Sequence, residues 1–125
     1  MLRIRPDQVK ALNASYRDEY VQRTRGDFRL RWPDECSSLD DEELEDLIRA
    51  ARGSAESYGI ETVGDVVLFT EAWLLIGDDF DTNPDYPWAD RILQDTAMSG
   101  SAKASAIRHQ TLLLLDEIAR EGEAN

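Results

Sequence analysis

The side chains whose spacing best suggests chemistry lie between residues 78 and 90. Oxygen-bearing side chains recur there at every second position, with a further acid at the twelfth: Asp79, Asp81, Asn83, Asp85 and Asp90. This is the ligand rhythm of a calcium loop. However, Pro84 stands where that loop needs glycine for its sharp turn, and Asp90 stands where a longer glutamate is preferred. We therefore favour a second interpretation, in which short polar side chains bond their own backbone in turns.

Two other residues could support catalysis, one histidine and one cysteine. His109 stands between Arg108 and Gln110, and the sequence ties no nucleophile to it. Cys36 follows Glu35, and we expect the nearby acids to raise the pKa of its thiol, which disfavours a reactive thiolate. A single cysteine and a single histidine provide neither an internal disulfide nor a zinc site. We expect neither residue to be catalytic.

Larger catalytic signatures are missing from the sequence. With 26 acidic residues in the chain, close carboxylate pairs arise without any hydrolytic purpose. A glycine-rich phosphate loop, a G-x-S-x-G motif and an H-E-x-x-H motif are all absent. We predict a protein that is not an enzyme and that uses no cofactor and no metal.

Length and composition indicate one globular domain. The chain has 125 residues, of which 42% are hydrophobic and 32% charged, and its mean hydropathy is -0.52. Its apolar runs, such as Leu112 to Leu115, are far too short for a membrane span. The basic first residues are not followed by an apolar stretch, so no secretory signal is expected. We expect a soluble protein that resides in the cytoplasm.

The charge is divided unevenly along the chain. Residues 1–32 hold eight basic and four acidic residues, a net charge of +4, whereas residues 33–125 hold six basic and 22 acidic residues, a net charge of -16. A total of -12 disfavours nucleic acids and anionic membranes and favours basic protein partners. The basic first segment can pair with the acidic remainder of the same chain or of a second copy, so a homo-oligomer stays open.

The first half of the chain predicts two helices. Pro6 suits a first helical position, and a basic helix over residues 6–32 follows, with a break or bend near Gly26 and a stop at Pro33. Its apolar positions are spaced by three and four residues: Val9, Leu12, Tyr16 and Tyr20. Asp40 and Glu43 then resemble a capping box, and Gly59 is a natural stop for the second helix.

The second half predicts three more helices and no strand. Thr62 caps a third helix that ends at Gly77, and Pro87 opens a short fourth helix after a loop. A fifth helix follows the break at residues 98–101, runs to about Glu121 and buries apolar residues along one stripe: Ala104, Ile107, Leu114 and Ile118. The expected fold is all-α, an irregular bundle of about five helices in one domain over residues 1–125, with an acidic helical body at 38–121 and a frayed tail at 122–125.

Aromatic residues beside the acidic loop suggest a contact surface. Tyr86 and Trp88 flank Pro87 and can serve as exposed anchors for a protein partner, although Trp88 can equally seal the bundle. The candidate partner-binding residues extend from the loop into the short helix: Asp78, Asp79, Phe80, Asp81, Tyr86 and Trp88.

One stretch of the chain carries a family resemblance. Its residues lie between Tyr58 and Asp95: Tyr58-Gly59-Ile60, Asp65-Val66, Phe69, Gly77, Phe80-Asp81, Pro87-Trp88-Ala89 and Ile92-Leu93. Together they resemble small acidic all-helical accessory proteins encoded in bacterial type VI secretion clusters, near the VgrG and PAAR spike genes. The resemblance implies an adaptor, chaperone or regulator, and it brings no catalytic residues.

These observations favour a non-catalytic protein-interaction module, an accessory factor for a type VI secretion effector or spike component. The alternative is an acidic immunity protein or nucleic-acid mimic that blocks the basic active site of a toxin. A calcium-dependent regulator ranks third and an enzyme fourth.

Overall fold

In the computed structural model, the backbone is described for residues 6–124 and the side chains for residues 19–122. These residues form helices and contain no strand, which confirms the predicted all-α class. Six helices are described: α1 (Pro6–Arg31), α2 (Pro33–Cys36), α3 (Asp41–Ser57), α4 (Val63–Ile76), α5 (Pro87–Leu93) and α6 (Gly100–Ala124). The sequence missed only the four-residue α2. Within the described range, no helix combines the length and the apolar character that a membrane crossing requires.

The chain divides into two compact units, Met1–Ile48 and Arg49–Asn125. The first unit holds α1, α2 and the start of α3, and the second holds the rest of α3 together with α4, α5 and α6. We describe each unit by itself, and the expectation of a single domain stays a prediction.

The first unit begins with α1, which starts at the predicted Pro6. Of the predicted break or bend near Gly26, the break is wrong, because α1 continues through this residue to Arg31, and the bend stays a prediction. Glycine costs a helix only about 1 kcal/mol relative to alanine, and the buried residues around it hold the helix in place: Val21, Thr24 and Phe28. The predicted apolar positions Val9, Leu12 and Tyr16 lie outside the described side chains.

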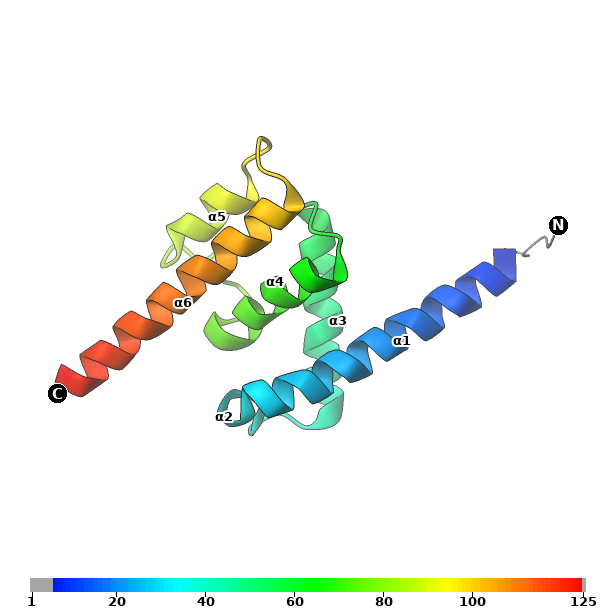
Figure 1. The fold of residues 1–125 in the computed structure, drawn as a ribbon, viewed down its shortest axis with the longest axis horizontal. Coiled ribbons are helices and arrows are strands. Elements are labelled where there is room, and N and C mark those ends of the chain that lie inside the picture. Colours follow the sequence, from blue (N-terminus) through cyan, green and yellow to red (C-terminus); the bar gives the residue numbers. More distant parts are fainter. Residues whose placement is uncertain (1–5, 125) are drawn as a thin grey trace. The chain divides into compact units, whose positions relative to one another are not determined.

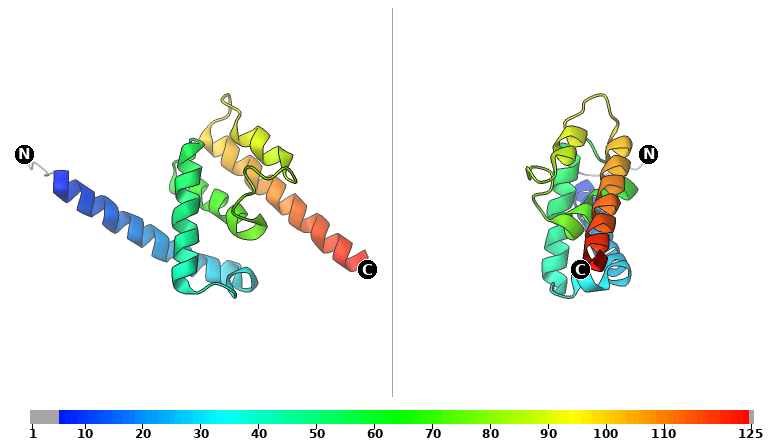
Figure 2. Two further views of the ribbon diagram at one scale, coloured as in Figure 1. Left: turned by 180° about the vertical axis from the view of Figure 1, so that it is seen from behind. Right: turned by 90° about the vertical axis from the view of Figure 1, so that its left-hand side faces the viewer.

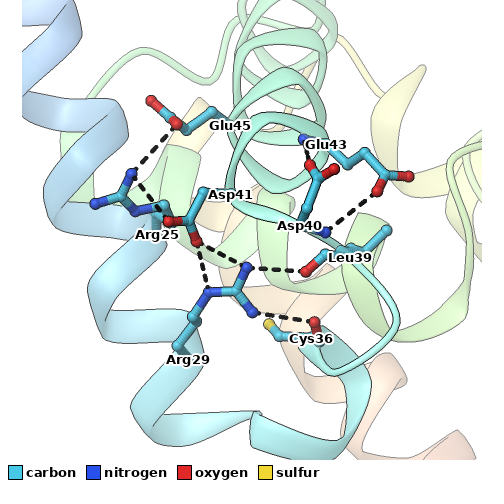
Figure 3. A network of polar contacts seen from close by, with 8 residues as sticks. All are labelled: Arg25, Arg29, Cys36, Leu39, Asp40, Asp41, Glu43 and Glu45. Atoms are coloured by element: carbon cyan, nitrogen blue, oxygen red, sulfur yellow. Dashed lines mark hydrogen bonds and ion pairs between the residues drawn. The ribbon is translucent and has the colours of Figure 1, made fainter.

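Both ends of α3 follow the sequence prediction. At its start the backbone N–H of Glu43 donates to Asp40 Oδ1 at 2.8 Å, and the backbone N–H of Asp40 donates to Glu43 Oε1 at 3.2 Å (Figure 3). This is the reciprocal pair of a capping box. At its end the N–H of Gly59 bonds the carbonyl of Glu56, and the N–H of Ile60 bonds the carbonyl of Ala55. With Gly59 at a φ of 80°, these two bonds form a Schellman motif.

The second unit places α6 along α4 and α5 (Figures 1 and 2). Helix α4 begins after Thr62 and ends at Gly77 as predicted, and α5 begins at the predicted Pro87. The Thr62 hydroxyl does not cap the α4 backbone but donates to Asp65 Oδ2 at 2.5 Å. The core of this unit includes fully buried apolar side chains of α4, α5, α6 and the loop between α4 and α5: Phe69, Phe80, Ala89, Ala104 and Ile107.

Backbone segments come unusually close where α3 ends and α6 begins. A Cβ atom added to Gly100 would lie 2.1 Å from the carbonyl oxygen of Gly59 and 3.2 Å from the Cα of Ile60. Beside this contact, the buried Lys103 donates from Nζ to the carbonyl oxygen of Tyr58 at 3.0 Å. A cation at the end of α3 complements the free carbonyls and the negative pole of that helix.

The outer half of α6 departs from the prediction. Ala104 and Ile107 are buried as expected, whereas Ile118 is 55% exposed and Leu114 is only partly buried. The helix extends beyond α4 and α5 at this end, so those two helices do not cover its last turns (Figures 1 and 2). It also continues to Ala124, past the predicted end near Glu121.

Candidate functional site

The loop between α4 and α5 is held by its own polar groups. The backbone N–H groups of Thr82 and Asn83 both bond the carbonyl of Asp79, at 3.0 and 2.9 Å. The Asn83 side chain accepts a hydrogen bond at Oδ1 from the backbone N–H of Asp85, at 2.9 Å. This last bond is an Asx turn, in which a short side chain stabilises its own backbone. The turn interpretation of this segment is therefore confirmed.

The structure does not gather the predicted calcium ligands into one coordination sphere. Asp81 accepts a hydrogen bond from the hydroxyl of Tyr58 at 2.6 Å, and Asn83 is engaged with Asp85 and Asp79. Asp90 belongs to the following helix, α5. Among the described residues, no group of three or more His, Cys, Asp or Glu side chains is arranged to hold a metal ion.

The hydrogen bond between Tyr58 and Asp81 ties this loop to the end of α3. The pKa of Tyr58 is raised above its ordinary value, first because the hydroxyl is withdrawn from water and then because it donates to the Asp81 carboxylate. The Tyr58 ring lies against Phe69, with ring centroids 6.1 Å apart, and Phe69 lies against Phe80 at 5.2 Å. The loop is thus fixed at Asp81 by a hydrogen bond and at Phe80 by aromatic packing.

The six candidate contact residues differ in their exposure. Asp81 is partly exposed, and its carboxylate accepts the hydrogen bond from Tyr58. Asp78 and Asp79 are exposed, as a partner-binding role requires. Phe80 is fully buried against Phe69, which removes it from the accessible contact surface. Tyr86 and Trp88 are partly exposed, and their ring centroids lie 6.0 Å apart at an angle of 48°. An aromatic pair is therefore partly exposed where the loop meets α5, the loop carries exposed acids, and Phe80 anchors the loop in the core.

The two residues considered for catalysis differ in their exposure. His109 is exposed on α6. Cys36 is buried, and the pKa of its thiol is raised, as predicted. The main cause is withdrawal from water; Glu35 contributes less, and the nearby Arg29 opposes the shift.

The first unit contains a network of arginine contacts. The sequence predicted pairing between the basic segment and acids but not the individual residue pairs. Arg29 donates to the carbonyl oxygens of Cys36 and Leu39, at 3.1 and 2.9 Å, and its Nε donates to Asp41 at 3.0 Å (Figure 3). One turn earlier on α1, Arg25 bonds Glu45 at 3.2 Å. The basic first segment therefore does pair with acids that follow it. The spacing of four residues between the two arginines is the only sequence signal that places both on one helix face.

Comparison of the chain with known protein families, with curated proteins and with solved structures gave no match.

Proposed function

We propose that this protein is a non-catalytic module that binds another protein through the loop between α4 and α5. The observation that supports this function is the aromatic pair of Tyr86 and Trp88, partly exposed where the loop meets the start of α5. The loop backbone before this pair is fixed by its own turns. Aromatic side chains in such positions contribute much of the binding energy of protein interfaces. A pre-ordered loop also loses little conformational entropy when a partner binds.

The resemblance to accessory proteins of type VI secretion clusters supports a more specific proposal. In this proposal the protein acts in the bacterial cytoplasm as an adaptor or chaperone for a secreted effector or a spike component. The alternative is an immunity protein that occupies the basic active site of a toxin. The net charge of -12 and the exposed Asp78, Asp79 and Asp85 of the loop favour this alternative.

The test is a pull-down with tagged protein from the native bacterial lysate, at low and at high salt, with mass spectrometry of the bound proteins. A spike component or effector that stays bound at high salt supports the adaptor, because apolar anchors resist screening. A basic toxin released by salt supports the immunity protein. An eluate empty at both salt concentrations contradicts both.

The double substitution Tyr86→Ala and Trp88→Ala shows whether the loop is the interface. We expect it to abolish capture while the helical circular dichroism stays unchanged. Leu30→Ala is the matched control, because Leu30 is 84% exposed on α1 and does not belong to the loop. If the double variant captures the partner as well as the native protein does, the loop is not the interface.

A further inference from the structure

The apolar stripe of α6 continues toward the end of the helix, where α6 extends beyond α4 and α5. Ile107 and Thr111 are buried, Leu114 and Leu115 are partly exposed, and Ile118 is 55% exposed. Successive residues of an α-helix are turned by about 100°, so positions 107, 111, 114, 115 and 118 share one side of α6. We call Leu114, Leu115 and Ile118 the outer stripe. Its residues have the spacing of a helix seam, and their exposure rises toward the end of α6, which extends beyond α4 and α5 (Figure 2).

The opposite side of the same helix differs from this stripe. Leu113 is 45% exposed and stands about half a turn away from the stripe. Its neighbours on that side are charged, with Arg120 Nη2 bonded to Asp116 Oδ2 at 2.9 Å. Leu112 is 44% exposed and stands about a third of a turn from the centre of the stripe. Leu112 and Leu113 are exposed leucines of the kind that most protein surfaces carry, whereas the outer stripe is a continuation of the core.

Charge indicates what the outer stripe can accept. Exposed Glu117 and Glu121 border one flank of the stripe, and residues 49–125 hold six basic and 14 acidic residues, a net charge of -8. Arg108, on the other flank, lies more than two turns before Ile118. A second copy that presented the same stripe would bring two surfaces of the same sign together, which costs binding energy. A helix with basic side chains opposite Glu117 and Glu121 would gain attraction as well as apolar contact.

We propose that the outer stripe of α6 binds a cationic amphipathic helix of a partner protein, with the apolar residues of that helix on the stripe and its lysines or arginines along the Glu117 side. This proposal rests on the proposed function as a protein-binding module, and it adds a second contact surface, separate from Tyr86 and Trp88. The two surfaces can be tested independently.

The direct test uses two synthetic amphipathic peptides and fluorescence anisotropy. The first peptide has leucines at helical spacing and lysines along one flank, and the second has glutamate in place of every lysine. We expect the lysine peptide alone to bind. In the protein, Ile118→Glu should weaken binding about tenfold or more, equivalent to about 1.4 kcal/mol. Leu113→Glu adds the same charge on the opposite side and should change affinity less than about twofold.

A charge reversal tests the flank. Glu117→Lys should weaken binding of the lysine peptide and improve binding of the glutamate peptide. The proposal is overturned if neither peptide binds, if both bind alike, or if Ile118→Glu and Leu113→Glu have equal effects. It is also overturned if light scattering of the protein alone shows a dimer that Ile118→Glu dissociates, because a second copy then occupies the stripe. If the peptides fail but the lysate still yields a partner, the protein-binding function stands without this surface.

Discussion

Two corners of the molecule join helix ends by opposite means. In the second unit, the end of α3 and the start of α6 approach through two glycines, and a Cβ atom on Gly100 would lie 2.1 Å from the Gly59 carbonyl oxygen. In the first unit, the end of α1 reaches the start of α3 through Arg25 and Arg29, whose long side chains span the gap.

The two corners should differ in how strongly amino-acid substitutions destabilise them. Backbone atoms in direct contact leave no room for an additional methyl group, because they cannot move without displacing a whole helix. Guanidinium groups at a partly exposed surface make several separable bonds, and solvent can replace some of them. We therefore expect an abrupt loss at the glycine corner and a graded loss at the arginine corner.

The largest effect is expected for Gly100→Ala. The added methyl group meets the backbone of Gly59 and Ile60, so the free energy of unfolding should fall by about 3 kcal/mol. Gly53→Ala is the matched control, because a Cβ at this helical position meets nothing within 4 Å. That control should stabilise the protein by about 0.5 to 1 kcal/mol. Urea unfolding followed by circular dichroism measures both, and equal effects of the two substitutions would remove the distinction.

A smaller effect is expected for Arg29→Ala. The substitution removes hydrogen bonds to two backbone carbonyls and to Asp41, so the free energy of unfolding should fall by about 1 to 2 kcal/mol. Arg29→Lys should restore only part of this loss, because an ammonium group lacks the planar fork of donors. Arg23→Ala, at an exposed position of the same helix, should change stability by less than about 0.5 kcal/mol. A loss as large as that of Gly100→Ala would contradict the graded behaviour.

The smallest effect is a pH dependence near the glycine corner. Asp65 accepts hydrogen bonds from Ser101 and Thr62, which lower its pKa below the ordinary 3.8. Because the folded pKa is the lower one, the stability that this carboxylate contributes is fully present above pH 3.8 and is lost as the pH falls through the folded value. Melting temperatures of the native protein and of Asp65→Asn should therefore differ near neutral pH and converge in acid. If the difference in melting temperature stays constant into strong acid, the substitution acts through side-chain packing and not through the charge of Asp65.

Sequence predicted the features that depend on neighbouring residues. The capping box at Asp40 and Glu43, the stop at Gly59 and the start at Pro87 all follow from local backbone chemistry. Contacts between residues distant in sequence could not be predicted. One example is the hydrogen bond from Lys103 to the carbonyl of Tyr58, because these two residues are 45 positions apart. Helical periodicity identified the apolar side of α6 correctly, but periodicity cannot tell where the covering helices stop, so Ile118 was placed in the core.

The candidate site shows the same division. The turn chemistry of Asn83 and Asp85 could be inferred from residue type, because an Asx turn involves only adjacent residues. The anchoring of the loop could not be inferred from the sequence. Tyr58 and Asp81 are 23 residues apart, and Phe80 contacts Phe69 only in the folded chain. Phe80 was therefore grouped with the exposed contact residues although it lies in the core.

The uneven cover of α6 also means that one continuous helix does not open as one unit. Amide hydrogens near Ala104 and Ile107 lie in the packed core and should exchange with solvent only when the second unit unfolds as a whole. Those beyond Ile118 lie in turns whose described side chains are exposed, and they should exchange through local fraying, orders of magnitude faster. A bound partner would extend the slowly exchanging region toward the end of the helix, so that the length of the protected segment itself reports occupancy.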